Sequence, residues 1–300
     1  MKVWVTNESS SFARGFDAWC DGTGEHELVN SLRNDELDYF RQDSIFRSQE
    51  IDLFDPTLPT MISRSGAEII IHQLPITPEL AYEHKDYALR HNIEGSHYVI
   101  EAAKEVNIPI IFVTSRHINK TKISNSFHNE TISDLYNITA KTVESLLDLE
   151  YPNHTSIIPP IIYGPEFDSG ISGLIKTAIN GDDVVINLDP DMSHPFMHAS
   201  DFFDALGLVV NGFKPEYSYI EITPDPKDYI SLDVIITELE NNNLFLSYEI
   251  HPDKDLILDD QRVSDHISEY FNWEPKFPIE DGLEDVITKI REQHDNKGTE

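Results

Sequence analysis

A group of small and polar side chains follows the first apolar run of the chain. Val3–Thr6 is typical of a buried strand, and residues 7–15 (NESSSFARG) come directly after it. A loop that binds nucleotide phosphates needs small residues, because its backbone must approach them and the next helix must point its N-terminus at them. Asn7 tolerates a left-handed turn, Ser10 is small, and Ala13 permits close packing of a helix on a strand. A Ser-rich helix cap without a ligand explains the same residues, so both interpretations remain open here.

A second group has the residue types of a metal site. His194, His198 and Asp201 have a spacing that could bind a divalent cation. The single cysteine, Cys20, excludes an intramolecular disulfide and a cysteine-cluster metal site.

The chain carries a large negative charge. Its 300 residues include 22 Lys and Arg against 54 Asp and Glu, a net charge of −32. Nucleic-acid backbones and anionic membranes would be repelled, which argues against both as main partners. No apolar run approaches the roughly 18 residues of a membrane-spanning helix, and the N-terminus lacks the pattern of a signal peptide. We therefore expect a soluble cytoplasmic protein.

Short β-rich runs alternate with helical stretches in the first half of the chain. The patterns predict strands over Val3–Thr6, His26–Asn30, Glu68–His72, Ile110–Val113 and Ser156–Ile162, and helices over Phe12–Cys20, Asn92–Val106 and Ser133–Leu147. This alternation predicts right-handed βαβ units and an α/β fold, a doubly wound parallel sheet of the Rossmann type. After Gly164-Pro165 the segments become shorter, more polar and richer in proline. We expect a domain over residues 1–165 and a smaller one over 166–300, partly interleaved with the first.

Several segments, in order along the chain, resemble the motifs of one family. They are Glu50–Pro56, His72–Pro75, Asn92–Ser96, Glu101–Pro109, Ile111–Ser115, Pro160–Pro165, Phe196–Asp201 and Phe271–Leu283. Together they resemble the extended short-chain dehydrogenases/reductases, in the group of NAD-dependent nucleotide-sugar epimerases and dehydratases. Each motif alone is weak, but the ordered set covers nearly the whole chain. The resemblance implies an NAD(P)-binding first domain and a substrate-binding second domain.

The resemblance also implies a Ser/Thr–Tyr–Lys catalytic set, in which a tyrosinate acts as general base or acid. It places Ser115 at the first position and Tyr136 at the second. The family's lysine lies about one helical turn after the tyrosine, where this chain has Ala140. Lys141 comes one residue late and is rotated by about 100° around the helix axis. Either its long side chain or a local π-bulge brings Lys141 back to the site, or the usual lysine is missing.

The remaining site residues follow from the same resemblance. It implies that NAD or NADP contacts Asn7, Ser10, Ser11, Phe12, Asp52, Leu53, Gln73, Leu74, Asn92 and Thr114. It places Tyr163 and His194 at substrate-binding positions, with His194 where relatives carry a phosphate-binding arginine. Because His194, His198 and Asp201 then fall on a strand and a loop, we expect no metal there. Arg116-His117 replaces the Asp-Glu pair of dehydratases, which argues against sugar 4,6-dehydration, and Arg33 after the second strand would favour NADP.

Two functions remain open from the sequence. The first is an NAD(P)-dependent nucleotide-sugar epimerase or reductase that acts by transient hydride transfer at a sugar hydroxyl. The second is a catalytically impaired family member that keeps the fold and acts as a binding or regulatory protein. The resemblance further implies a homodimer formed through residues 92–106 and 133–147. We also hypothesise that the charge of −32 reflects work in a salt-rich cytoplasm, where charges are strongly screened.

Overall fold

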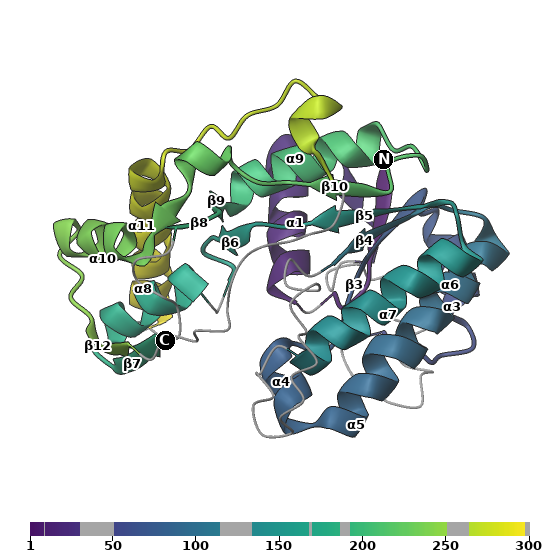
Figure 1. Ribbon diagram of the computed structural model, residues 1–300, viewed down its shortest axis with the longest axis horizontal. Coiled ribbons are helices and arrows are strands. Elements are labelled where there is room, and N and C mark those ends of the chain that lie inside the picture. The colour runs from purple at the N-terminus through teal and green to yellow at the C-terminus, as the bar shows by residue number, and fades with distance from the viewer. Residues whose placement is uncertain are drawn as a thin grey trace. The chain divides into compact units, whose positions relative to one another are not determined.

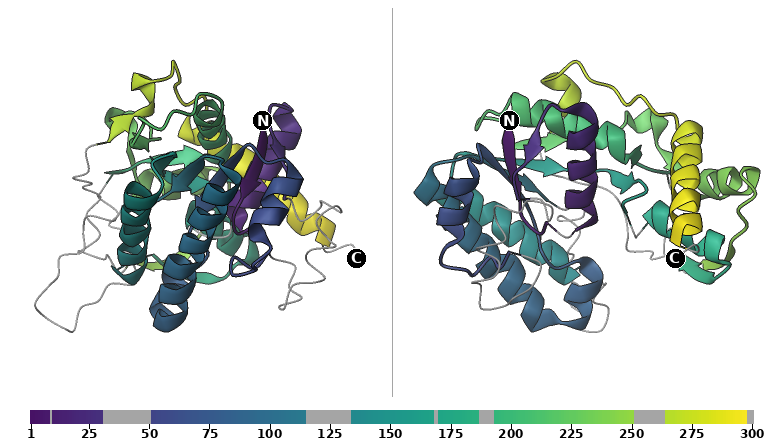
Figure 2. Two further views of the ribbon diagram at one scale, coloured as in Figure 1. Left: turned by 90° about the vertical axis from the view of Figure 1, so that its right-hand side faces the viewer. Right: turned by 180° about the vertical axis from the view of Figure 1, so that it is seen from behind.

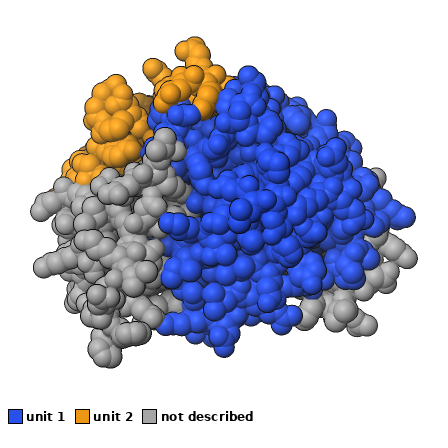
Figure 3. All heavy atoms as spheres, turned by 45° about the vertical axis from the view of Figure 1, so that its right-hand side comes forward, with its two compact units in different colours: residues 1–159, 206–221, 259–266 blue, residues 160–205, 222–258, 267–300 orange. Residues whose placement is uncertain are grey.

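A seven-stranded parallel sheet takes five strands from the first 158 residues and two from later in the chain (Figure 1). The computed structural model describes residues 1–8, 10–30, 51–114, 134–167, 170–186, 193–250 and 264–297. These divide into two compact units, coloured in Figure 3. Unit 1 comprises residues 1–159, 206–221 and 259–266, and unit 2 comprises residues 160–205, 222–258 and 267–300.

The strand order of unit 1 confirms the predicted α/β class. In spatial order the strands are β13 (Asp265–His266), β10 (Tyr219–Glu221), β5 (His154–Ile158), β4 (Ile110–Val113), β3 (Ile69–Gln73), β1 (Lys2–Val5) and β2 (Glu27–Leu28). Every neighbouring pair is parallel. From β1 the chain first adds β2 on one side and then β3 on the other. In sheets of this kind, ligands bind at the carboxyl ends of the strands where the order reverses.

Helices cover both faces of this sheet, as the two views in Figure 2 show. On one face, α3 (Leu58–Ser65), α6 (Gly95–Val106) and α7 (Asp134–Glu150) pack on strand residues such as Trp4, Ile70 and Phe112. The other face carries α1 (Ser11–Thr23) and the C-terminal part of α9 (Ala199–Asn211). The two helices approach closely, since a Cβ atom at Gly207 would lie 2.5 Å from the Trp19 ring. Glycine at this position is therefore required by packing.

The strand predicted over Ser156–Ile162 is wrong as a single element. The chain forms β5 within unit 1 and then β6 (Ile161–Tyr163), which pairs with β9 (Phe196–His198) in unit 2. Pro159 and Pro160 separate the two strands. Because proline has no N–H to donate to a ladder, the pair ends one strand and allows the chain to cross into the other unit.

The helix predicted over Asn92–Val106 begins earlier and is not regular. It runs through α5 (Lys85–Ala88), the π-helical segment η2 (Leu89–Glu94) and α6. Within η2, Asn92 is fully buried and bonds to chain segments outside the helix. Such π-helical turns often occur at functional sites, because they re-aim a side chain. A further helix, α4 (Pro78–Glu83), precedes α5.

Unit 2 has its own core and smaller sheets. β7 (Asp183–Ile186) pairs in parallel with β12 (Ser247–Ile250), and β8 (Ser193–His194) pairs antiparallel with β11 (Ile230–Ser231). The helices α8 (Gly170–Asn180), α10 (Leu232–Asn241) and α11 (Ile279–Lys297) contribute apolar faces to one core cluster. Unit 2 also contains two short 3₁₀ segments, η4 (Pro226–Asp228) and η5 (Ile267–Glu269). None of the described helices is long and apolar enough to cross a membrane.

Candidate functional site

The loop after β1 has no glycine, but one of its residues takes a backbone conformation that glycine usually provides. Asn7 has φ +58°, in the left-handed region that asparagine tolerates. Ser10 is the N-cap of α1, and its Oγ accepts the N–H of Ala13 at 3.1 Å. The first turn of α1 has no acidic residue, which favours an anion at this positive helix end.

Gln73, at the end of β3, ties this loop to the neighbouring strand. Its Nε2 donates to the Thr6 carbonyl at 3.1 Å and to Ser10 Oγ at 2.7 Å. The Gln73 N–H also donates to Thr6 Oγ1 at 3.0 Å. The carboxyl ends of β1 and β3 therefore form one bonded unit at the edge where the strand order reverses.

A cavity of about 510 Å³ opens beside this loop. Its lining consists of Asn7, Ile51, Asp52, Leu53, Phe54, Pro75, Ile76, Tyr87, Arg90 and His91. The segment after position 50 is held in place by the buried Glu8, whose Oε1 accepts the Ile51 N–H at 2.5 Å. Asp52 Oδ1 accepts the Phe54 N–H at 3.0 Å, which fixes the turn that brings Asp52 and Leu53 to the cavity.

Flat rings and one cation form the outer wall of the cavity. The Phe54 ring meets His91 edge to face at 5.2 Å, and the Arg90 guanidinium lies over the same ring at 5.1 Å. Burial and the nearby Arg90 lower the pKa of His91, while Asp52 and Glu94 oppose that shift. Aromatic and cation–π groups of this kind favour stacked or edge-on contacts with other planar rings.

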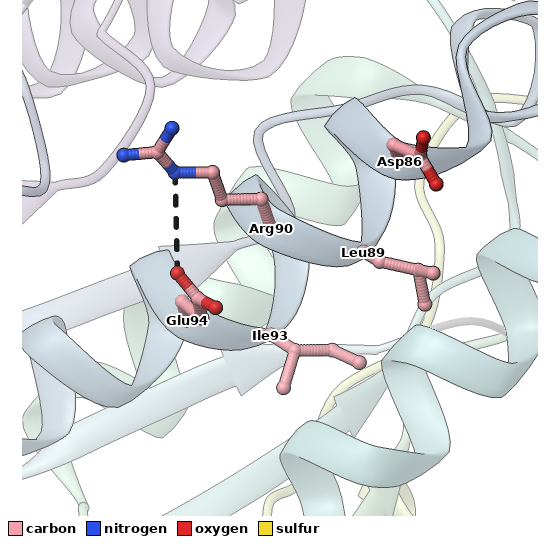
Figure 4. A pocket seen from close by; sticks show the side chains of 5 residues that line it. All are labelled: Asp86, Leu89, Arg90, Ile93 and Glu94. Carbon is pink, nitrogen blue, oxygen red and sulfur yellow. Dashed lines mark ion pairs between the residues drawn. The ribbon is translucent and has the colours of Figure 1, made fainter.

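Arg90 also borders a second, open hollow on the outer side of the same helical segment. This hollow of about 590 Å³ is lined by Asp86, Leu89, Arg90, Ile93 and Glu94 (Figure 4). An ion pair of 3.9 Å joins Arg90 and Glu94, and both side chains are about two-thirds exposed. An exposed pair of this kind contributes little to stability.

Tyr136 lies half-buried on α7, beside a buried polar contact that fixes this part of the helix. The Thr139 hydroxyl donates to the Tyr136 carbonyl at 2.8 Å and accepts from Asn92 Nδ2 at 3.0 Å. Asn92 also accepts the N–H of Ile76 at 3.0 Å, just after β3. Asn92 thereby joins the tyrosine helix to the loop that lines the cavity.

The position implied for the lysine is occupied by a core residue. Ala140, one turn after Tyr136, is fully buried in the cluster formed by α3, α6, α7 and the sheet. Lys141 is exposed. No π-bulge interrupts α7 here, and the hydroxyls of Thr142 and Ser145 donate to carbonyls four residues back, as in a regular helix. The geometry places Lys141 on a different face of α7 from Ala140.

The end of β4 is anchored by a buried carboxylate. Thr114 Oγ1 donates to Glu144 Oε1 on α7 at 2.5 Å, and both residues are buried. Ser115, the implied catalytic serine, follows directly but lies outside the described residues, as do Arg33, Arg116 and His117.

The two implied substrate residues belong to unit 2. Tyr163 is 1% exposed, and burial together with Asp201, Glu280 and Asp285 raises the pKa of its hydroxyl. His194 is fully buried on β8. The Asp201 carboxylate accepts the N–H groups of Lys276 and Phe277 at 3.0 and 2.9 Å, which gives it a structural partner on both oxygens.

Metal ligation has a different geometric candidate from the one the spacing suggested. Among the described residues, the His, Cys, Asp and Glu side chains close enough to share an ion are His97, Glu101 and Glu150. Lys104 Nζ already contacts both glutamates, at 2.6 and 3.0 Å. His198 Nε2 lies 3.3 Å from Asp285, and burial lowers its pKa despite that carboxylate.

The structure brings together part of the residue set expected from the sequence. Asn7, Asp52 and Leu53 line one cavity, Gln73 and Ser10 bond beside it, and the buried Leu74 follows Gln73. Sequence reasoning missed Glu8, which holds the segment at Ile51, and the lining residues Phe54, Tyr87, Arg90 and His91. One signal was present, because Tyr87, Arg90 and His91 immediately precede the Asn92 motif on the same helical segment.

Comparisons with known proteins agree with this architecture. The model of the family described as "NAD dependent epimerase/dehydratase family" matches residues 25–218. No curated protein matches the chain in sequence. Three similar solved structures are UDP-glucuronic acid 4-epimerase from Bacillus cereus (in complex with UDP-glucuronic acid and NAD), UDP-glucose 4-epimerase from Thermotoga maritima (with UDP-glucose) and L-threonine dehydrogenase from Phytophthora infestans. Their identities to this chain are 15%, 17% and 15%, with TM-scores of 0.72, 0.71 and 0.73. Each comparison covers 98% of this chain and 100% of the other, so these structures share its fold.

Proposed function

The chain belongs to the NAD dependent epimerase/dehydratase family, and we propose that it binds NAD or NADP and transfers hydride reversibly at a hydroxyl of a nucleotide sugar. One observation carries the proposal. The cavity lined by Asn7, Asp52 and Leu53 lies at the reversal point of the strand order, directly beside the N-terminus of α1. A dinucleotide needs both features, a cavity for its base and a helix end for its phosphates.

The residues present fit such a cofactor. Asn7, at φ +58°, would stand in for the first glycine of a phosphate loop, because asparagine tolerates the left-handed conformation. The N-terminus of α1, with Ser10, Ser11 and Phe12, would face the pyrophosphate. Leu53 and Phe54 would contact the adenine ring, with the Asp52 carboxylate as an acceptor for its amino group. Leu74 and Thr114 would border the cofactor at the ends of β3 and β4.

The chain's own residues would then handle the proton. When bound, a nicotinamide supplies a reversible hydride acceptor. The Tyr136 hydroxyl would take the proton of the sugar hydroxyl and return it later, and Ser115 would orient that oxygen. Hydride returned to the opposite face of the same carbon gives epimerisation. Hydride returned to another carbon reduces that carbon while the first one remains a ketone. The resemblance assigns substrate contacts to Tyr163 and His194, which are both buried in unit 2.

A specific observation also favours the second candidate, a family member that binds cofactor but turns over slowly. A lysine near the tyrosine lowers its pKa and favours the tyrosinate. Here Ala140 is buried in the core and Lys141 is exposed on another face of α7. Lys141 would contribute only if its side chain reached back along the helix surface toward Tyr136.

A turnover assay separates these two candidates. The protein is incubated with NAD+ or NADP+ and a panel of UDP- and dTDP-sugars, and the sugars are analysed by chromatography and the cofactor by absorbance. We expect interconversion of one sugar pair by the wild type and its loss in Tyr136→Phe, because the phenylalanine ring cannot move a proton. Turnover that is unchanged in Tyr136→Phe would refute the assigned base. Cofactor binding without turnover of any sugar would support the second candidate.

We also propose that the protein forms a homodimer through α6 and α7. These helices pack on each other and expose Tyr98, Ile138 and Leu149, of which Leu149 is 82% exposed. A partner that covered these helices would remove such apolar side chains from water.

A further inference from the structure

A continuous chain of buried hydrogen bonds connects the loop after β1 with the tyrosine helix. His72 stands at its centre, fully buried on β3, with Nδ1 at 2.9 Å from Thr6 Oγ1 and Nε2 at 2.8 Å from Ser96 Oγ. Thr6 accepts the N–H of Gln73, the residue bonded to the α1 cap. On the other side, Ser96 donates to the Asn92 carbonyl.

The proton positions along this chain follow from counting donors. Ser96 has a single hydroxyl proton, and its bond of 2.5 Å to the Asn92 carbonyl uses it. Ser96 must therefore accept from His72, which places the imidazole proton on Nε2 and leaves Nδ1 as an acceptor. The Thr6 hydroxyl has two acceptors within reach, His72 Nδ1 at 2.9 Å and the Gln73 carbonyl at 3.3 Å. Because the buried Nδ1 has no proton of its own, we assign the Thr6 proton to the shorter contact, with Nδ1.

The same direction continues into α7. Asn92 donates through Nδ2 to Thr139, whose only hydroxyl proton goes to the Tyr136 carbonyl. No link in this chain is charged, because burial lowers the pKa of His72 to about 3 and keeps the ring neutral at neutral pH. Buried polar groups that are all paired in one direction resist local rearrangement, since breaking one bond leaves an unsatisfied group.

We propose that His72 is a positioning residue that couples the α1 loop to the tyrosine helix, so that a ligand at the loop fixes the placement of Tyr136. The proposal rests on the proposed function, because it assumes that the loop receives a nucleotide and that Tyr136 serves the chemistry. It assigns a role to His72, Ser96 and Thr139, side chains that contribute no lining to the cavity. The coupling passes through β3 and α6, so it needs no contact between the ligand and the tyrosine ring.

The test uses ADP, which has the phosphates but lacks the nicotinamide that would touch the tyrosine directly. Protein labelled with 3-fluorotyrosine is studied by 19F NMR, and Tyr136→Phe assigns the Tyr136 signal. Thr139→Val cuts the chain at α7, and Thr139→Ser restores the hydroxyl. The matched control is Thr142→Val, which removes a comparable hydroxyl bond from the same helix outside the chain.

We expect ADP to shift the Tyr136 signal in the wild type, in Thr139→Ser and in Thr142→Val, and to lose that effect in Thr139→Val although ADP still binds. ADP that binds the wild type without moving the signal, or that moves it equally in Thr139→Val, would overturn the coupling. If ADP and NAD+ both fail to bind the wild type, the proposed function fails instead. In that case Thr6→Val tests the coupling. This substitution must shift the Tyr136 signal when Thr139 is present, and it must not shift that signal when Thr139→Val is also present.

Discussion

Tyr136 and Ala140 are separated by one turn of α7, and the Ala140 side chain is fully buried in the core on which the half-buried Tyr136 packs. A cation at this position would lie beside the phenol and favour its ionised form. Whether the protein is active therefore depends above all on the side chain at position 140.

We expect Ala140→Lys to increase turnover, because the ammonium would lower the pKa of the Tyr136 hydroxyl. Overpacking should reduce the free energy of unfolding by about 1–3 kcal/mol, and burial of the charged group should reduce it further. Initial rates between pH 6 and 10 and urea unfolding curves measure both effects. Ser145→Lys is the matched control, because it adds the same charge to an exposed position of α7. An equal gain in both variants would mean that the charge acts from a distance and not at the tyrosine.

A second prediction concerns the protonation of His72. Burial lowers its pKa to about 3, so the folded protein should hold a neutral ring with the proton on Nε2 at pH 5. Nitrogen chemical shifts of 15N-histidine-labelled protein report the tautomer and charge directly. A doubly protonated His72 at pH 5 would contradict the hydrogen-bond directions assigned to the buried chain.

The same shift makes stability depend on pH with a defined sign. Because the unfolded histidine binds a proton below its ordinary pKa of about 6.5 and the folded one does not, stability from this group is lost as pH falls from about 6.5 toward 3. The slope is at most about 1.4 kcal/mol per pH unit. The free energies of unfolding of the wild type and His72→Gln should differ least at acid pH, where the wild type has lost this contribution. If the difference in free energy of unfolding between the wild type and His72→Gln stays constant from pH 7 to pH 4, the folded His72 has its ordinary pKa.

Some elements follow from the sequence because their signals are local. The strands β3 and β4 can be predicted from their continuous apolar runs. The left-handed turn at Asn7 can be predicted because an asparagine side chain tolerates that conformation. The split of β5 and β6 also had a local signal, because Pro159 and Pro160 interrupt the apolar run. The π-helical segment had no local signal. Its buried Asn92 bonds to Ile76 and Thr139, which are distant in the sequence.

The site shows the same division between local and distant causes. Asp52 and Leu53 were expected from their motif, and they do line the cavity. The bridge from Gln73 to Ser10 was not expected, because it joins positions that are 63 residues apart. The burial of Ala140 likewise depends on how α7 packs on α6 and the sheet, which spacing along one helix cannot reveal.

The proposed dimer gives a third prediction. Leu149→Asp places a charge on the most exposed large apolar side chain of α7 and should shift the protein from dimer to monomer in light scattering. Phe245→Asp is the matched control, because Phe245 is 70% exposed but lies in unit 2. A wild-type protein that is monomeric at all concentrations, or an equal effect of both substitutions, would contradict the α6–α7 interface.

The charge of −32 gives a fourth prediction. Self-repulsion opposes the compact state, and it weakens as the Debye length falls to about 3 Å at 1 M salt. We expect the melting temperature to rise between 0.1 M and 2 M KCl. Matched experiments in KCl and in an uncharged osmolyte at the same osmolarity separate screening from exclusion effects. A melting temperature that falls as KCl increases would refute adaptation to salt.

A direct measurement of cofactor binding is the strongest test of the proposed NAD(P) site. The wild-type protein is titrated with NAD+, NADH, NADP+ and NADPH by calorimetry, at low and at molar KCl, with an Asp52→Ala, Leu53→Ala double variant as the comparison. The account predicts saturable binding of at least one of the four to the wild type, with one site per chain and weaker binding to the variant. The absence of binding by all four at millimolar concentration, in both salts, would contradict it.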